Sequence, residues 1–197
     1  GRMKKKKFNL KKDYQESWEY LKSSWGYILF VFVLFFLISA LVFSGMQSEE
    51  LNEMVKEQLK KIVEKFEGKG AFETVVLIFA NNVLASFLGI ALGVFFGVIT
   101  LMMIFSNAYV IGFVADLSVE KAGLGILWSL VPHGVFELPA IFISFGLGLK
   151  LGSFFISKNP WNELKKRNKH SMKVFILIVV PLLILAAVIE GLLIVLF

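Results

Sequence analysis

The chain has 197 residues, of which 57% are hydrophobic and only 18% are charged. Its apolar runs are too long for a soluble domain to cover with polar surface, so the sequence predicts an integral membrane protein without disulfides or thiolate metal sites, since cysteine is absent. The net charge of +6 gathers at the N-terminus and in residues 158–173, where membrane orientation explains it and no nucleic-acid partner is expected.

The first 26 residues form a basic and aromatic segment that we expect to lie in the cytoplasm. Lys4 to Lys7 are followed by a polar helix rather than by a short apolar core and a cleavage site, so no cleavable signal peptide is predicted. Aromatic side chains typical of the membrane interface then lead into a first span at residues 27–46. From residue 27 onward we expect a single transmembrane helical domain.

Residues 47–70 interrupt the apolar pattern with a strongly polar segment. Apolar side chains recur in it at helical spacing, with Glu and Lys on the other faces. This pattern predicts an amphipathic helix outside the bilayer, which serves either as a solvated strut or as a docking face for another protein. The apolar positions are Leu51, Val55, Leu59, Ile62 and Phe66.

Residues 71–115 are nearly uncharged and about twice as long as one span requires. We divide them into spans at 73–92 and 96–115, with a hairpin near Gly89, Gly93 and Gly97. Glycines at this spacing let helices approach closely, and we interpret them as packing residues. A short polar loop is expected to follow, with Asp116, Glu120 and Lys121.

The apolar stretch 122–156 is too long for one simple span and contains Pro132 and Pro139. We expect Gly123 to Val131 to dip into the bilayer and return, and a fourth span to occupy residues 133–155. A fifth span occupies residues 174–194. An even number of crossings between the two basic stretches places both in the cytoplasm, so the 47–70 helix and the C-terminus are expected outside. The predicted fold is an all-α bundle of about five spans.

Ionisable and amide side chains within these spans are candidates for a functional site, because a polar group at membrane depth is costly unless it is paired. His133 and Glu137 are four residues apart, which places them on one helix face. At about 1.5 Å per residue, all the candidates fall in the outer half of the bilayer, so the topology predicts one shared polar pocket. Its predicted members are Asn81, Asn82, Asn107, His133, Glu137 and Glu190.

Two chemistries suit such a pocket, namely a proton shared between carboxyl groups or a bound cation. His133, Glu137 and Glu190 form a candidate ligand set for zinc or another divalent ion, although the HExxH spacing of metallopeptidases is absent. The alternative is a purely structural role, in which the asparagines only form hydrogen bonds to a neighbouring helix. Lys150 is expected to extend its ammonium group to the cytoplasmic face, without any further role.

The segment from Pro132 to Ile141 (PHGVFELPAI) closely resembles the signature of the stage II sporulation protein M family. The resemblance covers residues 70–195. It implies a polytopic membrane component without a settled enzymatic activity, which in spore-forming bacteria localises peptidoglycan-degrading partners during engulfment. Other positions similar to that family are Asn81, Asn82, Gly89, Ile90, Gly93, Asn107, Gly112 and Glu190.

The leading hypothesis is therefore a non-enzymatic membrane scaffold with protein partners in the membrane, and the small-residue faces also permit a homodimer. A transporter or ion-binding protein is the alternative, because polar groups gather beside a broken segment. An intramembrane hydrolase would need a metal ion held by His133, Glu137 and Glu190. The sequence contains no nucleotide-binding fingerprint.

Overall fold

The computed structural model describes residues 9–196, apart from the side chains of residues 128–133 and 192–196. This part of the chain is helical without strands, and five of its helices are long and apolar enough to cross a membrane. The predicted all-α membrane bundle is confirmed. The α-helices are α1 (Leu10–Ser23), α2 (Trp25–Phe43), α3 (Glu49–Phe66), α4 (Ala71–Ala91), α5 (Val98–Ala122), α6 (Leu127–Gly152), α7 (Pro160–Val174) and α8 (Val180–Leu196).

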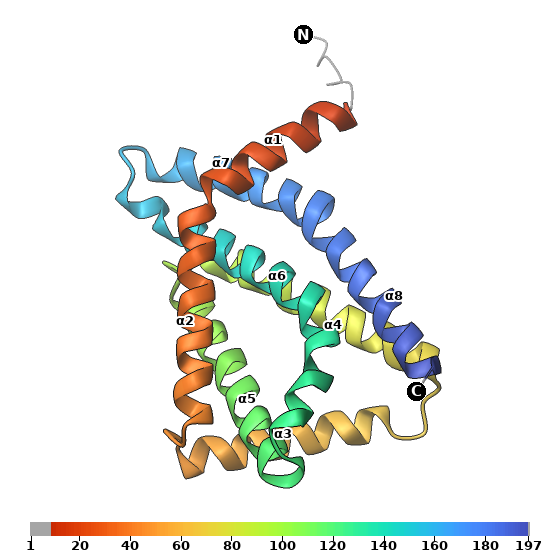
Figure 1. The fold of residues 1–197 in the computed structure, drawn as a ribbon. Helices are drawn as coiled ribbons and strands as arrows, with labels where there is room; N and C mark the ends of the chain where they lie inside the picture. Colours follow the sequence, from red (N-terminus) through yellow and green to blue (C-terminus); the bar gives the residue numbers. More distant parts are fainter. Residues whose placement is uncertain (1–8, 197) are drawn as a thin grey trace.

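The two basic parts of the chain lie together at one end of the bundle. Figure 1 shows α1 beside α7 at the top and α3 across the bottom, with the spans between them. The ammonium group of Lys173 on α7 forms ion pairs with Asp13 and with Glu16 of α1, the second at 2.7 Å. Four spans separate α1 from α7, as the charge bias requires.

α6 is the central helix, because it packs against α2, α4, α5 and α8. One core cluster joins α2, α5 and α6 around the fully buried Phe35 and Phe145. A second joins α4, α6 and the start of the last span around Ile90 and Leu147. These two clusters fix the relative positions of the spans from both sides of α6.

Glycines bring the backbones of α4 and α6 into contact. A Cβ atom on Gly148 would overlap the carbonyl oxygen of Gly89, and one on Gly93 would overlap that of Gly148. The hydroxyl of Thr100 on α5 also donates to the Gly89 carbonyl at 2.9 Å. The hairpin between α4 and α5 turns at Gly97, whose φ of +74° lies in the left-handed region that favours glycine. The predicted packing role of these glycines is confirmed.

The polar loop predicted after residue 115 is instead part of a helix. α5 continues through Asp116, Glu120 and Lys121 and ends only at Gly123, whose φ is +78°. Nothing earlier in this segment breaks a helix, and charged residues are tolerated once the helix leaves the apolar core. The carboxylate of Asp116 accepts a hydrogen bond from Gln47 at 2.6 Å, which ties this end of α5 to the segment before α3.

The segment predicted to dip and return also differs in the structure. A short 3-10 turn at Leu124–Ile126 leads directly into α6, which starts at Leu127. Residues before Pro132 thus form the first turns of the fourth span rather than a separate re-entrant loop. Figure 1 shows that α6 bends along its length. The helix contains Pro132 and Pro139, and the missing N–H and bulky ring of a proline disfavour a straight helix.

α7 and α8 are joined by a π-helical turn at Phe175–Val179. Pro181, two residues after this turn, has no N–H to donate to the carbonyl of residue 177, so the regular hydrogen-bond ladder cannot continue through this point. Because of this junction, the basic helix and the last span form one long helical stretch, which counts as 32 residues from Pro160 to Gly191.

We expect Gly148→Ala to lower the free energy of unfolding by about 1–3 kcal/mol, because the added methyl group forces α4 and α6 apart. Gly26→Ala is the matched control, since nothing lies within 4 Å of a Cβ atom there. Thermal unfolding of both variants in detergent measures the difference. Equal stability of the two variants would contradict the close approach of the helices.

Candidate functional site

The structure brings together two of the predicted intramembrane polar residues in a direct contact. The amide of Asn82 on α4 donates to Oε1 of Glu137 on α6 at 2.5 Å. Both side chains are partly buried. The contact links residues far apart in the sequence, and it crosses the interface that the glycines of α4 and α6 hold closed.

Glu190 contributes a second carboxyl group from α8. The charge of Glu190 acts on Glu137, which places the two carboxyl groups within electrostatic range of each other. Oε2 of Glu190 is buried, and α8 packs against both α4 and α6. Asn82 and Glu137 are thus in direct contact, and Glu190 on the neighbouring helix α8 acts on Glu137 through its charge. Two adjacent carboxyl groups at membrane depth favour a shared proton or a bound cation.

The other two asparagines do not join this contact. Asn81 is exposed on the surface of α4. The amide of Asn107 donates to the carbonyl of Met103 on its own helix, at 2.8 Å. Asn107 thus has a structural role, a local hydrogen bond within α5. The sequence had left open whether its role was structural or functional.

The prediction for His133 concerns a side chain outside the described residues. Its backbone lies in the first turns of α6, one helical turn before Glu137. Among the described residues, no group of three or more His, Cys, Asp or Glu side chains is suited to hold a metal ion. The ligand set of His133, Glu137 and Glu190 therefore stays a prediction.

An apolar groove of about 430 Å³ lies near the three polar residues, between the start of α4 and the end of α8. Its lining includes Gly191, the residue directly after Glu190, and consists almost entirely of hydrocarbon. The lining residues are Ala71, Phe72, Val75, Val76, Phe79, Ile184, Ala187, Val188 and Gly191.

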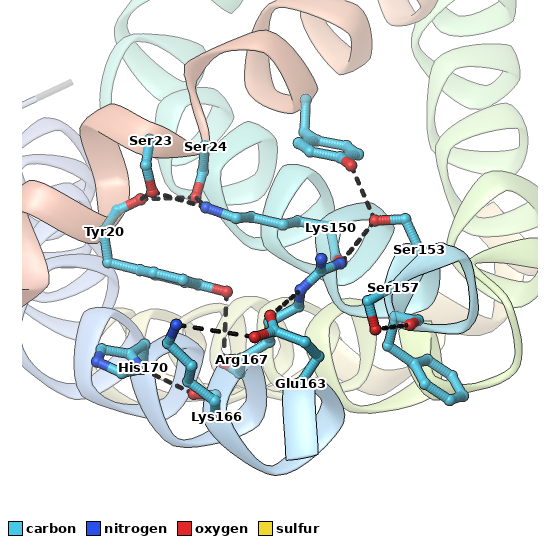
Figure 2. A network of polar contacts seen from close by, with 12 residues as sticks. Tyr20, Ser23, Ser24, Lys150, Ser153, Ser157, Glu163, Lys166, Arg167 and His170 are labelled. Carbon is cyan, nitrogen blue, oxygen red and sulfur yellow. Dashed lines mark hydrogen bonds and ion pairs between the residues drawn. The ribbon is translucent and has the colours of Figure 1, made fainter. Parts of the chain in front are cut away.

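A second polar cluster lies at the opposite end of the bundle and centres on Lys150. Figure 2 shows its ammonium group between the hydroxyl groups of Ser23 and Ser24, at 2.7 and 2.9 Å. The same group lies 4.0 Å from the ring centroid of Tyr20, a cation–π contact. Lys150 does extend toward this end, but it also fastens α6 to the junction of α1 and α2.

Arg167 joins this cluster from α7. Its guanidinium group donates to the carbonyl of Lys150 at 2.6 Å and to the hydroxyl of Ser153 at 2.8 Å, and it pairs with Glu163 at 3.3 Å. The ring of His170 stacks on Tyr20, with 5.1 Å between the centroids (Figure 2). The cluster thus connects α1, α6 and α7.

Titrating groups of α1 reflect these contacts. Burial raises the pKa of the Tyr20 hydroxyl above its ordinary value, so the phenol stays neutral at physiological pH. The hydrogen bond from Lys173 lowers the pKa of Glu16. The stabilisation from this ion pair is therefore present above the ordinary pKa of a glutamate and is lost as the pH falls through the lowered value.

Sequence reasoning missed the role of the Lys150 cluster. One available signal was the lysine inside an apolar span, which is costly unless its charge reaches water or a partner. The partners themselves come from α1 and α7. Ser23 of α1 is 127 residues away from Lys150 along the chain, and Arg167 of α7 is 17 residues away. Spacing within one helix cannot identify such partners.

The family comparison concerns nearly the whole chain. A family model described as Stage II sporulation protein M matches residues 28–193. The match runs from near the start of the first span into the last one, and it includes α3 as well as Asn82, Glu137 and Glu190. No curated protein and no solved structure matches the chain.

We expect Asn82→Ala to lower the free energy of unfolding by about 1 kcal/mol, because it removes a hydrogen bond between helices. Asn81→Ala is the control, since it deletes the same amide from the neighbouring exposed position. Thermal unfolding in detergent compares the two. A loss of stability from Asn81→Ala as large as that from Asn82→Ala would contradict the assignment.

Proposed function

This chain belongs to the stage II sporulation protein M family, and from that premise we propose that it is a non-enzymatic membrane scaffold. The end that carries α1 and α7 faces the cytoplasm, while α3 and the C-terminus face outward. Partner proteins bind α3. The contact of Asn82 with Glu137, together with the carboxyl group of Glu190, forms a polar site in the outer half of the bundle, where a proton or a cation joins the two carboxyl groups.

The incomplete burial of α3 is the observation that carries this proposal. Val55 is buried at 6% exposure against Tyr109 and Phe113 of α5. Further along the same helix, Ile62 is 47% exposed and Val63 is 66% exposed. The bundle thus covers only the first half of an apolar stripe, and the second half remains open to a partner.

The covered half of α3 is held firmly enough to present the open half in a fixed orientation. The hydroxyl of Tyr109 donates to Oδ1 of Asn52 at 2.8 Å and accepts from the backbone N–H of Ser48 at 2.9 Å. The side chain of Ser48 caps the helix N-terminus by accepting from the N–H of Leu51. A preorganised helix loses little conformational freedom on binding, which favours a stable complex.

The double variant Ile62→Gln with Val63→Gln tests the docking face, since it removes apolar surface without changing charge. We expect it to reduce partner recovery at least about tenfold in cross-linking and affinity capture from native membranes. The fold should persist, because both side chains are largely exposed.

The control is the double variant Glu57→Gln with Lys61→Gln, which also leaves the net charge unchanged. These two residues pair at 2.7 Å on the polar side of α3, so partner recovery should stay at the level of the unmodified chain. Recovery of the protein alone, or equal losses in both double variants, would rule out α3 as a docking face.

An ion transporter is the second candidate, and the convergence of polar groups from α4, α6 and α8 is the observation that favours it. A scaffold predicts that liposomes containing the unmodified chain carry no more cation flux than liposomes containing Glu137→Gln. Fluorescent ion indicators measure this flux. A flux that disappears in Glu137→Gln would replace the scaffold with the transporter.

A further inference from the structure

A groove of about 450 Å³ lies at the α1/α7 end of the bundle, between α7, the end of α4 and the end of α6. Its volume falls in the range of small-ligand sites. Apolar side chains form most of its wall, while a lysine and an asparagine from α7 form its polar part. The lining residues are Phe87, Ala91, Val94, Leu151, Leu164, Lys165, Asn168 and Met172.

The polarity of this groove changes with depth in the bilayer. The stretch from Pro160 to Gly191 has 32 residues, or about 48 Å, whereas the hydrocarbon core is about 30 Å thick. The basic start of this stretch must therefore lie at the headgroup level. Lys165 and Asn168 lie there, and Met172 lies about 6–10 Å deeper along the helix axis. Phe87 and Phe175, with ring centroids 5.8 Å apart, lie on the apolar side.

The charge at the shallow end is positive. α7 contains five Lys or Arg residues and one Glu. Figure 2 shows Lys166, Arg167 and His170 directed toward the Lys150 cluster, and Lys173 pairs with α1. Lys165 instead lines the groove, and within the described part of the chain no carboxylate forms an ion pair with it. This lysine is therefore available to an external anion.

We propose that the groove binds one anionic phospholipid of the cytoplasmic leaflet, with its phosphate at Lys165 and Asn168 and an acyl chain along Ala91, Leu151 and Met172. A phospholipid has a charged headgroup at the membrane surface and acyl chains below it. The groove likewise has its polar residues at the surface and its apolar residues deeper along the bilayer normal. The ammonium group of Lys165 and the amide of Asn168 are both donors suited to phosphate oxygens. The cytoplasmic leaflet supplies such lipids at high local concentration.

A peptide helix from a partner protein is a poorer occupant. The groove is closed on three sides by α4, α6 and α7 and is lined by short stretches of each helix, which suits a chain rather than a helix about 10 Å wide. A bound lipid in this position would also bridge α4 to α7, which belong to different parts of the sequence.

The test uses the full chain reconstituted in nanodiscs that contain phosphatidylcholine and a minor fraction of phosphatidylglycerol. Native mass spectrometry of the released protein measures the ratio of retained anionic to zwitterionic lipid. We expect Lys165→Gln to lower this ratio about fivefold, the effect of one lysine near an anionic headgroup. Ala91→Phe fills the apolar wall and should abolish retention of the lipid.

Lys166→Gln is the matched control, because it removes the same charge from the adjacent residue, which pairs with Glu163 at 3.7 Å. Its ratio should equal that of the unmodified chain. Equal reductions for Lys165→Gln and Lys166→Gln would show a diffuse attraction to the membrane surface and would overturn the proposal. If the unmodified chain retains the two lipids in the same proportion as the nanodisc contains them, the proposal is overturned as well. This result does not depend on how Ala91→Phe folds.

Discussion

The backbone contact between α4 and α6 is the constraint on which the rest of the bundle depends. Without a hydrophobic driving force between helices in lipid, close packing and hydrogen bonds between helices must hold the spans together. Gly89, Gly93 and Gly148 allow this approach because any Cβ atom there would overlap a neighbouring carbonyl group or ring. The same approach brings Asn82 within hydrogen-bond distance of Glu137 further along the interface.

The two ends of the bundle use polar groups in different ways. At the α1/α7 end, Lys150 and Arg167 find hydroxyl groups, carbonyl groups, an aromatic ring and a single carboxylate, which together fasten three helices. Both cations are partly buried, and these partners replace water that the charged groups lose. Away from that end, Glu137 and Glu190 lie on helices long and apolar enough to span a membrane, where a lone charge is costly. That cost makes the contact at Glu137 the stronger candidate for function.

The second half of α3 and the groove beside α7 are incompletely covered by the chain itself, and their chemistries differ. The second half of α3 exposes an apolar stripe among lysines and glutamates outside the spans, a composition suited to a protein surface. The groove beside α7 combines hydrocarbon with one lysine at the headgroup level, a composition suited to a lipid. The positions of these surfaces at opposite ends of the bundle allow both to be occupied at once.

The sequence by itself determined the membrane class, the five spans, the amphipathic helix α3 and the common end of the two basic segments, because hydropathy, helical period and charge bias are properties of local stretches. Local pattern also singled out Asn82, Glu137 and Glu190 as costly at their depth. It could not decide that Asn107 bonds its own helix, that α5 continues through Asp116, or that Lys150 joins α1 to α7. Those outcomes depend on which helix faces meet, and only the tertiary packing brings distant residues to one place.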